Sequence, residues 1–142
     1  MKHLSRLETA HQGLADLFNQ ASKPKQVEAV SRAIREALQA NDISQLHTEM
    51  RLLLTGSMPE NQMAELGSRC RELSDQLDAL YFDQEEGGEP ESVWSKSFCK
   101  SRAYAAIAEF CEKQPPEALY EALHSLKSND ETIASLVSYL SQ

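Results

Sequence analysis

The sequence predicts an all-α fold, a compact and mostly antiparallel bundle of six or seven helices. Apolar residues recur every three or four positions through most of the chain, which is the spacing of one helix face. Five glycines and five prolines among 142 residues are too few for the many tight turns of an all-β fold. The connections between helical segments are short, so neighbouring helices are expected to run antiparallel.

Length and composition predict one domain that covers residues 1–142. A chain of this size buries enough surface to fold without a disulfide or a metal. Aromatic residues make up only 6% of the sequence, so the core is expected to be mostly aliphatic.

Two long segments carry the clearest helical pattern. In 4–21 and 63–80 the apolar positions step alternately by three and four, which predicts heptad-like seams that pack as in left-handed bundles. The same seams are suited to homodimerisation, so a homodimer stays open. The expected helices lie, in order, near 4–21, 27–37, 43–53, 59–82, 93–113, 117–127 and 133–140.

Helix start and stop signals stand between these segments. Pro24 fits the first turn of the second helix. Asn41–Asp42 is expected to cap the third helix, and Ser92 the fifth. The stretch 83–91 is acidic and contains a glycine pair and a proline, so it is predicted to be a flexible loop.

The fifth predicted helix, near 93–113, differs from the others. Residues 103–108 read Ala-Tyr-Ala-Ala-Ile-Ala, which is apolar on nearly all sides. A helix of this kind is surrounded by neighbours, and its alanines let them approach closely. We therefore expect this helix to lie at the centre of the bundle.

The net charge of −8 is concentrated in one part of the chain. Residues 59–91 hold ten acidic and two basic side chains, whereas the segments on either side are nearly balanced. An acidic strip disfavours direct nucleic-acid binding, which needs a basic face. It attracts a basic protein surface instead. A solvated face that only keeps the chain soluble is the plain alternative.

Two aromatic residues directly after the acidic stretch share a helix face. Trp94 and Phe98 stand at i and i+4, where they pack in the bundle or anchor a partner. The candidate partner-binding residues are Glu72, Asp75, Asp78, Asp83, Glu85, Glu86, Glu89, Glu91, Trp94 and Phe98.

Two Glu-x-x-His pairs raise the question of a metal centre. Glu8 with His11, and Glu121 with His124, match the spacing that ligates di-iron in helical bundles when both pairs face inward. The leucines of the sixth helix are expected to turn Glu121 and His124 outward. We therefore predict no metal site and a packed His11.

The remaining residues predict no catalytic machinery. Cys70, Cys99 and Cys111 match neither a zinc pattern nor a redox motif, so reduced thiols in a cytoplasmic protein are expected. The sequence contains no phosphate-binding loop and no triad order. We predict no catalytic residue and no cofactor. The first residues contain no apolar run that could form a signal-peptide core, and the sequence contains no membrane-spanning stretch.

The function predicted from the sequence is a regulatory protein–protein interaction module. An adaptor, an inhibitor, an immunity-type protein and a dedicated chaperone all fit an acidic helical surface whose partner is another protein with a basic surface. Two alternatives stay open. One is a ligand-binding protein or enzyme with a site around His11, and the other is a nucleic-acid mimic that occupies a basic DNA- or RNA-binding protein.

Overall fold

Residues 5–142 are described by the computed structural model, and this part of the chain contains eight α-helices and no strand. The predicted all-α bundle is confirmed. Within these residues, no helix combines the length and the apolarity that crossing a membrane requires. The helices are α1 (Arg6–Ala10), α2 (Gln12–Gln20), α3 (Lys23–Ala40), α4 (His47–Leu54), α5 (Glu60–Glu86), α6 (Glu91–Cys111), α7 (Pro115–His124) and α8 (Asp130–Leu140).

The predicted first helix is in fact two helices. The chain leaves the helical conformation at His11, where φ is −141° and ψ is 65°. Leu7 in α1 and Leu14 and Phe18 in α2 are nevertheless buried in one core, so most of the predicted seam packs inside the chain. The first seam position, Leu4, lies outside the described residues.

Asn41 and Asp42 end α3, and the prediction that they start the next helix is wrong. The Asn41 side chain donates to the Ala37 carbonyl, and Asp42 takes a left-handed conformation with φ of 55°. Both features close the C-terminus of a helix. The predicted start of α3 is confirmed, since Ser22 caps it and Pro24 lies in its first turn.

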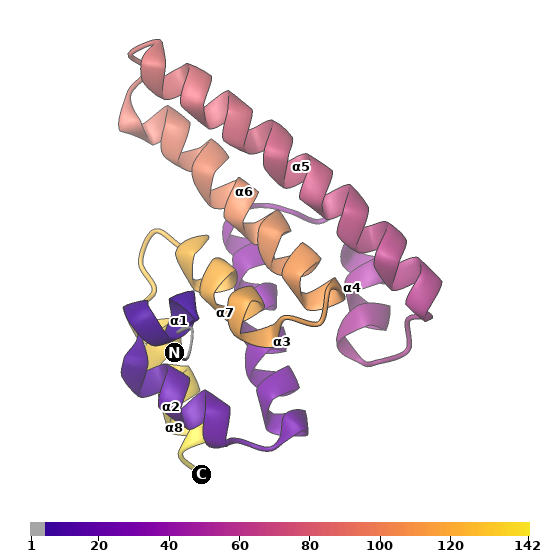
Figure 1. Ribbon diagram of the computed structural model, residues 1–142. Coiled ribbons are helices and arrows are strands. Elements are labelled where there is room, and N and C mark those ends of the chain that lie inside the picture. The colour runs from indigo at the N-terminus through magenta and orange to yellow at the C-terminus, as the bar shows by residue number, and fades with distance from the viewer. Residues whose placement is uncertain (1–4) are drawn as a thin grey trace.

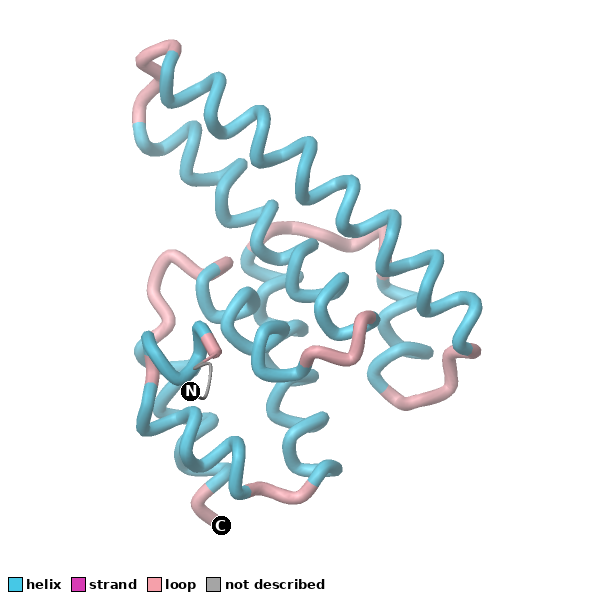
Figure 2. Tube along the Cα trace, in the orientation of Figure 1, coloured by secondary structure: helices cyan, strands magenta, loops and turns pink. Residues whose placement is uncertain are grey.

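The longest helices, α5 and α6, form a hairpin that projects beyond the rest of the molecule (Figure 1). The turn between them spans only residues 87–90 (Figure 2), so the predicted loop over 83–91 is wrong in its bounds. Residues 83–86 continue α5 because good helix formers precede the first glycine. Gly88 then reverses the chain with φ of 77°, and Pro90, not Ser92, precedes the first turn of α6.

The second half of α6 lies at the centre of the bundle, as the sequence predicts. Residues 103–108 are buried throughout. This half packs among α5, α7 and α3, while the first turns of α6 project with the end of α5 (Figure 1). α6 therefore joins the hairpin to the core.

Gly67 marks the closest approach of α5 to α6. A Cβ atom added at Gly67 would lie 2.9 Å from the Cβ of Cys111, which is closer than real Cβ atoms come. Since the contacted atom is fixed to the α6 backbone, it has little freedom to move away. The hairpin thus depends on the missing side chain at this position.

We predict that Gly67→Ala lowers the free energy of unfolding by about 1–3 kcal/mol, because overpacking outweighs the higher helix propensity of alanine. Gly13→Ala in α2 is the matched control, since a Cβ there meets no other part of the described chain within 4 Å. It is expected to leave stability unchanged or raise it by up to about 1 kcal/mol. Urea unfolding measures both, and equal stabilisation of both variants would contradict the tight contact.

Candidate partner-binding surface

The distal end of the hairpin, residues 75–98, carries a cluster of four aromatic rings. The Tyr81 ring lies at its middle, with centroids 5.6 Å from Trp94 and 5.3 Å from Phe98. Phe82 adds a further ring at 5.0 Å from Tyr81. This distal aromatic cluster (Tyr81, Phe82, Trp94 and Phe98) joins the last turns of α5 to the first turns of α6.

Two large apolar side chains of the distal end remain exposed. Phe82 is 59% exposed and Leu80 is 45% exposed. Phe82 follows Asp75 by seven residues and precedes Glu86 by four, so the three side chains share one stripe of α5. Along this stripe, the aromatic ring of Phe82 stands between the carboxylates of Asp75 and Glu86.

The distal end is also the most acidic part of the chain. Residues 75–98 contain seven acidic side chains and one basic side chain, Lys96. Five of the predicted partner-binding carboxylates lie exposed within about 10 residues of Phe82 along the chain. They are Asp83, Glu85, Glu86, Glu89 and Glu91.

The other predicted residues lie in different surroundings. Glu72 and Asp75 are exposed farther along α5, beside a shallow hollow that Gly67 and Cys111 also line. Trp94 is half-buried against Tyr81. Glu72 is therefore separate from the aromatic cluster, whereas Asp75 begins the stripe that leads to Phe82.

Asp78 faces inward and already has a charged partner. Its Oδ2 accepts a hydrogen bond of 2.9 Å from Nη2 of Arg102, and its Oδ1 accepts one of 2.6 Å from the Ser101 hydroxyl. Arg102 also lies over the Phe98 ring, 5.8 Å from its centroid. Asp78 thus holds Arg102 against the Phe98 ring of the aromatic cluster, and its carboxylate is not free to bind a partner.

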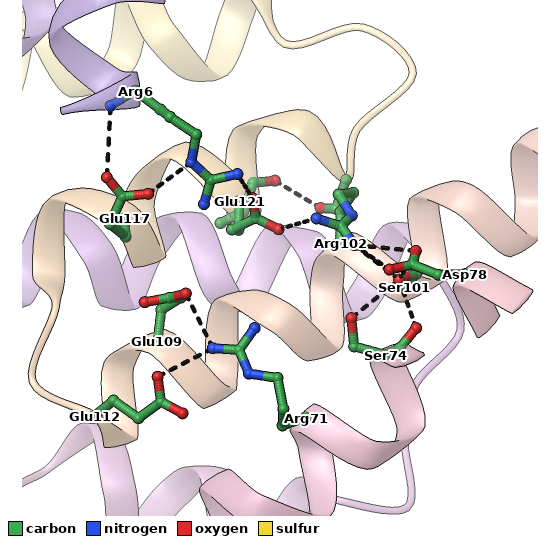
Figure 3. Close-up of polar contacts among 12 residues, drawn as sticks. Arg6, Arg71, Ser74, Asp78, Ser101, Arg102, Glu109, Glu112, Glu117 and Glu121 are labelled. Atoms are coloured by element: carbon green, nitrogen blue, oxygen red, sulfur yellow. Dashed lines mark hydrogen bonds and ion pairs between the residues drawn. The ribbon is translucent and has the colours of Figure 1, made fainter. Parts of the chain in front are cut away.

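Arg102 belongs to a central ion network that links four helices (Figure 3). Its Nη1 donates to Oε2 of Glu121 in α7 at 2.7 Å. On the other side of Glu121, Nη1 of Arg6 in α1 lies 2.7 Å from Oε1, and Arg6 Nε donates to Glu117 at 2.7 Å. The central ion network (Arg6, Asp78, Arg102, Glu117 and Glu121) therefore ties α1, α5, α6 and α7 together.

The burial of Glu121 corrects the prediction that it points outward. Only 1% of its surface is exposed. The reason is that α7 is covered by α6, α3 and α1, so it has more than one buried face. Burial raises the pKa of Glu121, and the nearby Arg102 and Arg6 offset this effect only in part.

His124 also faces the interior, where it meets His11. Their Nε2 atoms lie 3.3 Å apart, and the His124 ring stacks on Tyr120 with centroids 4.2 Å apart. The two Glu-x-x-His pairs thus bring their histidines together, but the Glu121 carboxylate is paired with arginines, and the Glu8 carboxylate accepts hydrogen bonds from Ser5. Among residues 5–142, no group of three potential metal ligands comes together.

The thiols are placed for packing. Cys70 and Cys111 are buried, and burial raises the pKa of Cys70 to about 12 and that of Cys111 to about 11. Burial also raises the pKa of the partly exposed Cys99. A thiol with a raised pKa is a poor nucleophile at neutral pH.

Sequence reasoning missed Leu80, Tyr81 and Phe82 as surface residues. The sequence pattern predicts Leu80 in the buried seam and Phe82 at the end of its helix, whereas both side chains are exposed within α5. The signal was present, because Phe82 stands seven residues after Asp75 on the polar face of α5. An aromatic residue on a polar helix face is the pattern that exposes a binding anchor.

Comparisons with known proteins give no relative: no protein-family model, no curated protein and no solved structure matches this chain. The distal end of the hairpin combines an exposed Phe82 with five exposed carboxylates that lie near it in the sequence.

From the contact between His11 and His124 we predict that the free energy of unfolding decreases in mild acid. Burial lowers the pKa of His124, and His11 and Arg6 lower it further. His124 therefore binds a proton less readily in the folded chain than in the unfolded chain, where the pKa of a histidine is about 6.5. This contribution to stability is fully present above that pH and is lost as the pH falls toward the lowered pKa.

Urea unfolding midpoints at about pH 7.5 and 5.5 measure this effect. His124→Gln is expected to reduce the loss of stability between the two conditions. His47→Gln is the control, because His47 is exposed at the start of α4 and is expected to keep the wild-type pH dependence. An unchanged pH dependence in His124→Gln would show that the pair does not govern it.

Proposed function

We propose that this protein is a protein-binding module that holds a basic segment of another protein on the distal end of its α5–α6 hairpin. The observation that carries the proposal is the 59% exposure of the Phe82 ring at an acidic, projecting end of the molecule. An exposed aromatic side chain surrounded by polar residues is typical of the anchor of an interface. The regulatory role and the cytoplasmic location expected from the sequence belong to the same proposal.

The apolar side chains supply affinity. Full burial of a leucine or phenylalanine side chain is worth about 1.5–3 kcal/mol. Aromatic residues near the centre of an interface dominate binding when the surrounding contacts exclude water. Phe82 fits such an anchor, because the stripe around it contains the small residue Ala79 and the charged residues Asp75 and Glu86.

The carboxylates determine which partner binds, by the charge of its surface. A surface with seven acidic side chains and one basic side chain attracts a basic segment and speeds its encounter. It repels the same surface of a second copy, so homodimerisation through two distal ends is disfavoured. An amphipathic segment that pairs lysines or arginines with one or two apolar residues complements both features.

Contacts between α5 and α6 keep the distal end ordered in the absence of a partner. Tyr81, Trp94 and Phe98 hold the ends of α5 and α6 against each other. Arg102 lies next to Phe98, pairs with Asp78 in the hairpin and connects this cluster to the core through the buried Glu121. A site that is already ordered before binding loses less conformational entropy on association.

The test is capture from native cells at low salt, with wild type and matched variants as baits and mass spectrometry to quantify what each retains. The proposal predicts one dominant protein partner that is lost or reduced at least about tenfold with Phe82→Ser combined with Glu86→Lys. Leu52→Ser combined with Asp16→Lys is the control, since it changes an exposed leucine and an exposed carboxylate elsewhere.

Binding to the purified partner is then followed by the emission of Trp94, the only tryptophan in the chain and part of the distal aromatic cluster. Retention of the partner by both double variants alike would reject the distal end as its site. A partner with an acidic contact surface would also contradict the proposal. Competition by DNA for the bound partner would identify a nucleic-acid-binding protein and support the mimic alternative.

A further inference from the structure

A second surface lies near the opposite end of α5, at the end of α3 and the short helix α4 (Figure 1). The two segments enclose an open hollow of about 670 Å³. The volume lies within the range of about 300–1,000 Å³ in which small molecules bind. The residues that line it are Arg35, Leu38, Gln39, Ile43, Ser44, His47, Met50, Arg51, Leu54 and Thr55.

The floor of the hollow is apolar. Ile43 and Met50 are buried beneath it, and Leu38 and Leu54 are half-buried at its sides. Methionine adapts its shape to irregular apolar ligands. This surface suits a hydrocarbon or aromatic body of modest size.

The rim of the hollow carries two arginines, although the chain as a whole is acidic. Arg35 and Arg51 are exposed around it together with the imidazole of His47, and no carboxylate lines it. Glu36 and Glu49, which neighbour the hollow in sequence, are engaged elsewhere: Glu36 accepts from Thr132, and Glu49 pairs with Arg69. The positive charge of the rim therefore has no counterpart in its walls.

The arginines of the rim differ from the other arginines of the protein because they make no ion pair within the described residues. The chain has seven arginines, and five of them make ion pairs within the described residues. Arg35 and Arg51 make none there, and both line the same hollow. A guanidinium group matches a carboxylate through two parallel hydrogen bonds, so two free guanidinium groups favour such a headgroup.

We infer that this hollow is a binding site for a small amphiphilic carboxylate, with the carboxylate at Arg35 and Arg51 and the apolar body over Ile43 and Met50. The site is independent of the distal end of the hairpin, because it is formed by α3 and α4. Its ligand has the opposite charge to the partner proposed for the distal end.

The experiment is isothermal titration calorimetry at low salt with three probes. Decanoate carries both the headgroup and the apolar body, acetate carries the headgroup alone, and decyltrimethylammonium carries a similar body with the opposite charge. Decanoate is expected to bind at least about tenfold more tightly than either of the others. Comparable binding of decanoate and decyltrimethylammonium would overturn the assignment of an anion site.

Matched variants locate the site. Arg35→Gln and Arg51→Gln are each expected to weaken decanoate binding by roughly tenfold, because each removes a charge-assisted hydrogen bond. Both side chains are exposed, so the fold is expected to tolerate the changes. Arg32→Gln, on the same helix but paired with Glu28, is the control and is expected to change the affinity by less than about twofold.

Three further outcomes would overturn the inference. The first is decanoate binding that both rim variants leave unchanged. The second is binding to anionic phospholipid vesicles without binding to monomeric decanoate, which would assign the rim to a membrane surface. The third is a salt-sensitive self-association that Arg35→Gln abolishes while decanoate does not bind, which would make the hollow an interface between copies of this chain.

Discussion

The guanidinium group of Arg102 lies between carboxylates from two other helices, Asp78 in α5 and Glu121 in α7, and the position of the hairpin depends on this contact. Glu121 is almost fully buried, so its charge must be compensated inside the protein. Arg6 completes the compensation from α1. Removing one member of such a group lowers stability by more than the energy of the lost ion pair, because the remaining charge stays buried without its partner.

The contacts that hold the hairpin lie apart from the surface proposed to bind a partner. The central ion network and the alanine-rich half of α6 fix the hairpin to the core, while its distal end projects beyond the other helices (Figure 1). Phe82 and the surrounding carboxylates can therefore remain exposed without loss of the fold. The hollow beside Arg35 and Arg51 lies at the other end of α5, so the protein offers an acidic surface and a basic one that do not compete.

The parts of this fold that depend on local sequence patterns were predictable, whereas those that depend on contacts between distant helices were not. The start of α3 at Ser22 and Pro24, and the buried run at 103–108, follow from capping and periodicity alone. The contact of His11 with His124 and that of Glu121 with Arg6 join residues more than 100 positions apart in the sequence. The leucines near the predicted sixth helix indicate one buried face, whereas α1, α3 and α6 together bury more than one face of α7. The acidic character of the distal end and the place of Phe82 among polar residues of α5 follow from the sequence, whereas the inward position of Asp78 does not, because it depends on Arg102 in α6.

The most direct test of this account is a double-mutant cycle on the two carboxylates that share Arg102. Urea unfolding gives the free energy of wild type, Asp78→Asn, Glu121→Gln and the double variant. The account predicts that the double variant loses more stability than the two single losses together, with a coupling of about 0.5–3 kcal/mol, because Arg102 then has no carboxylate partner. Losses that add to within about 0.5 kcal/mol would contradict the shared role of Arg102.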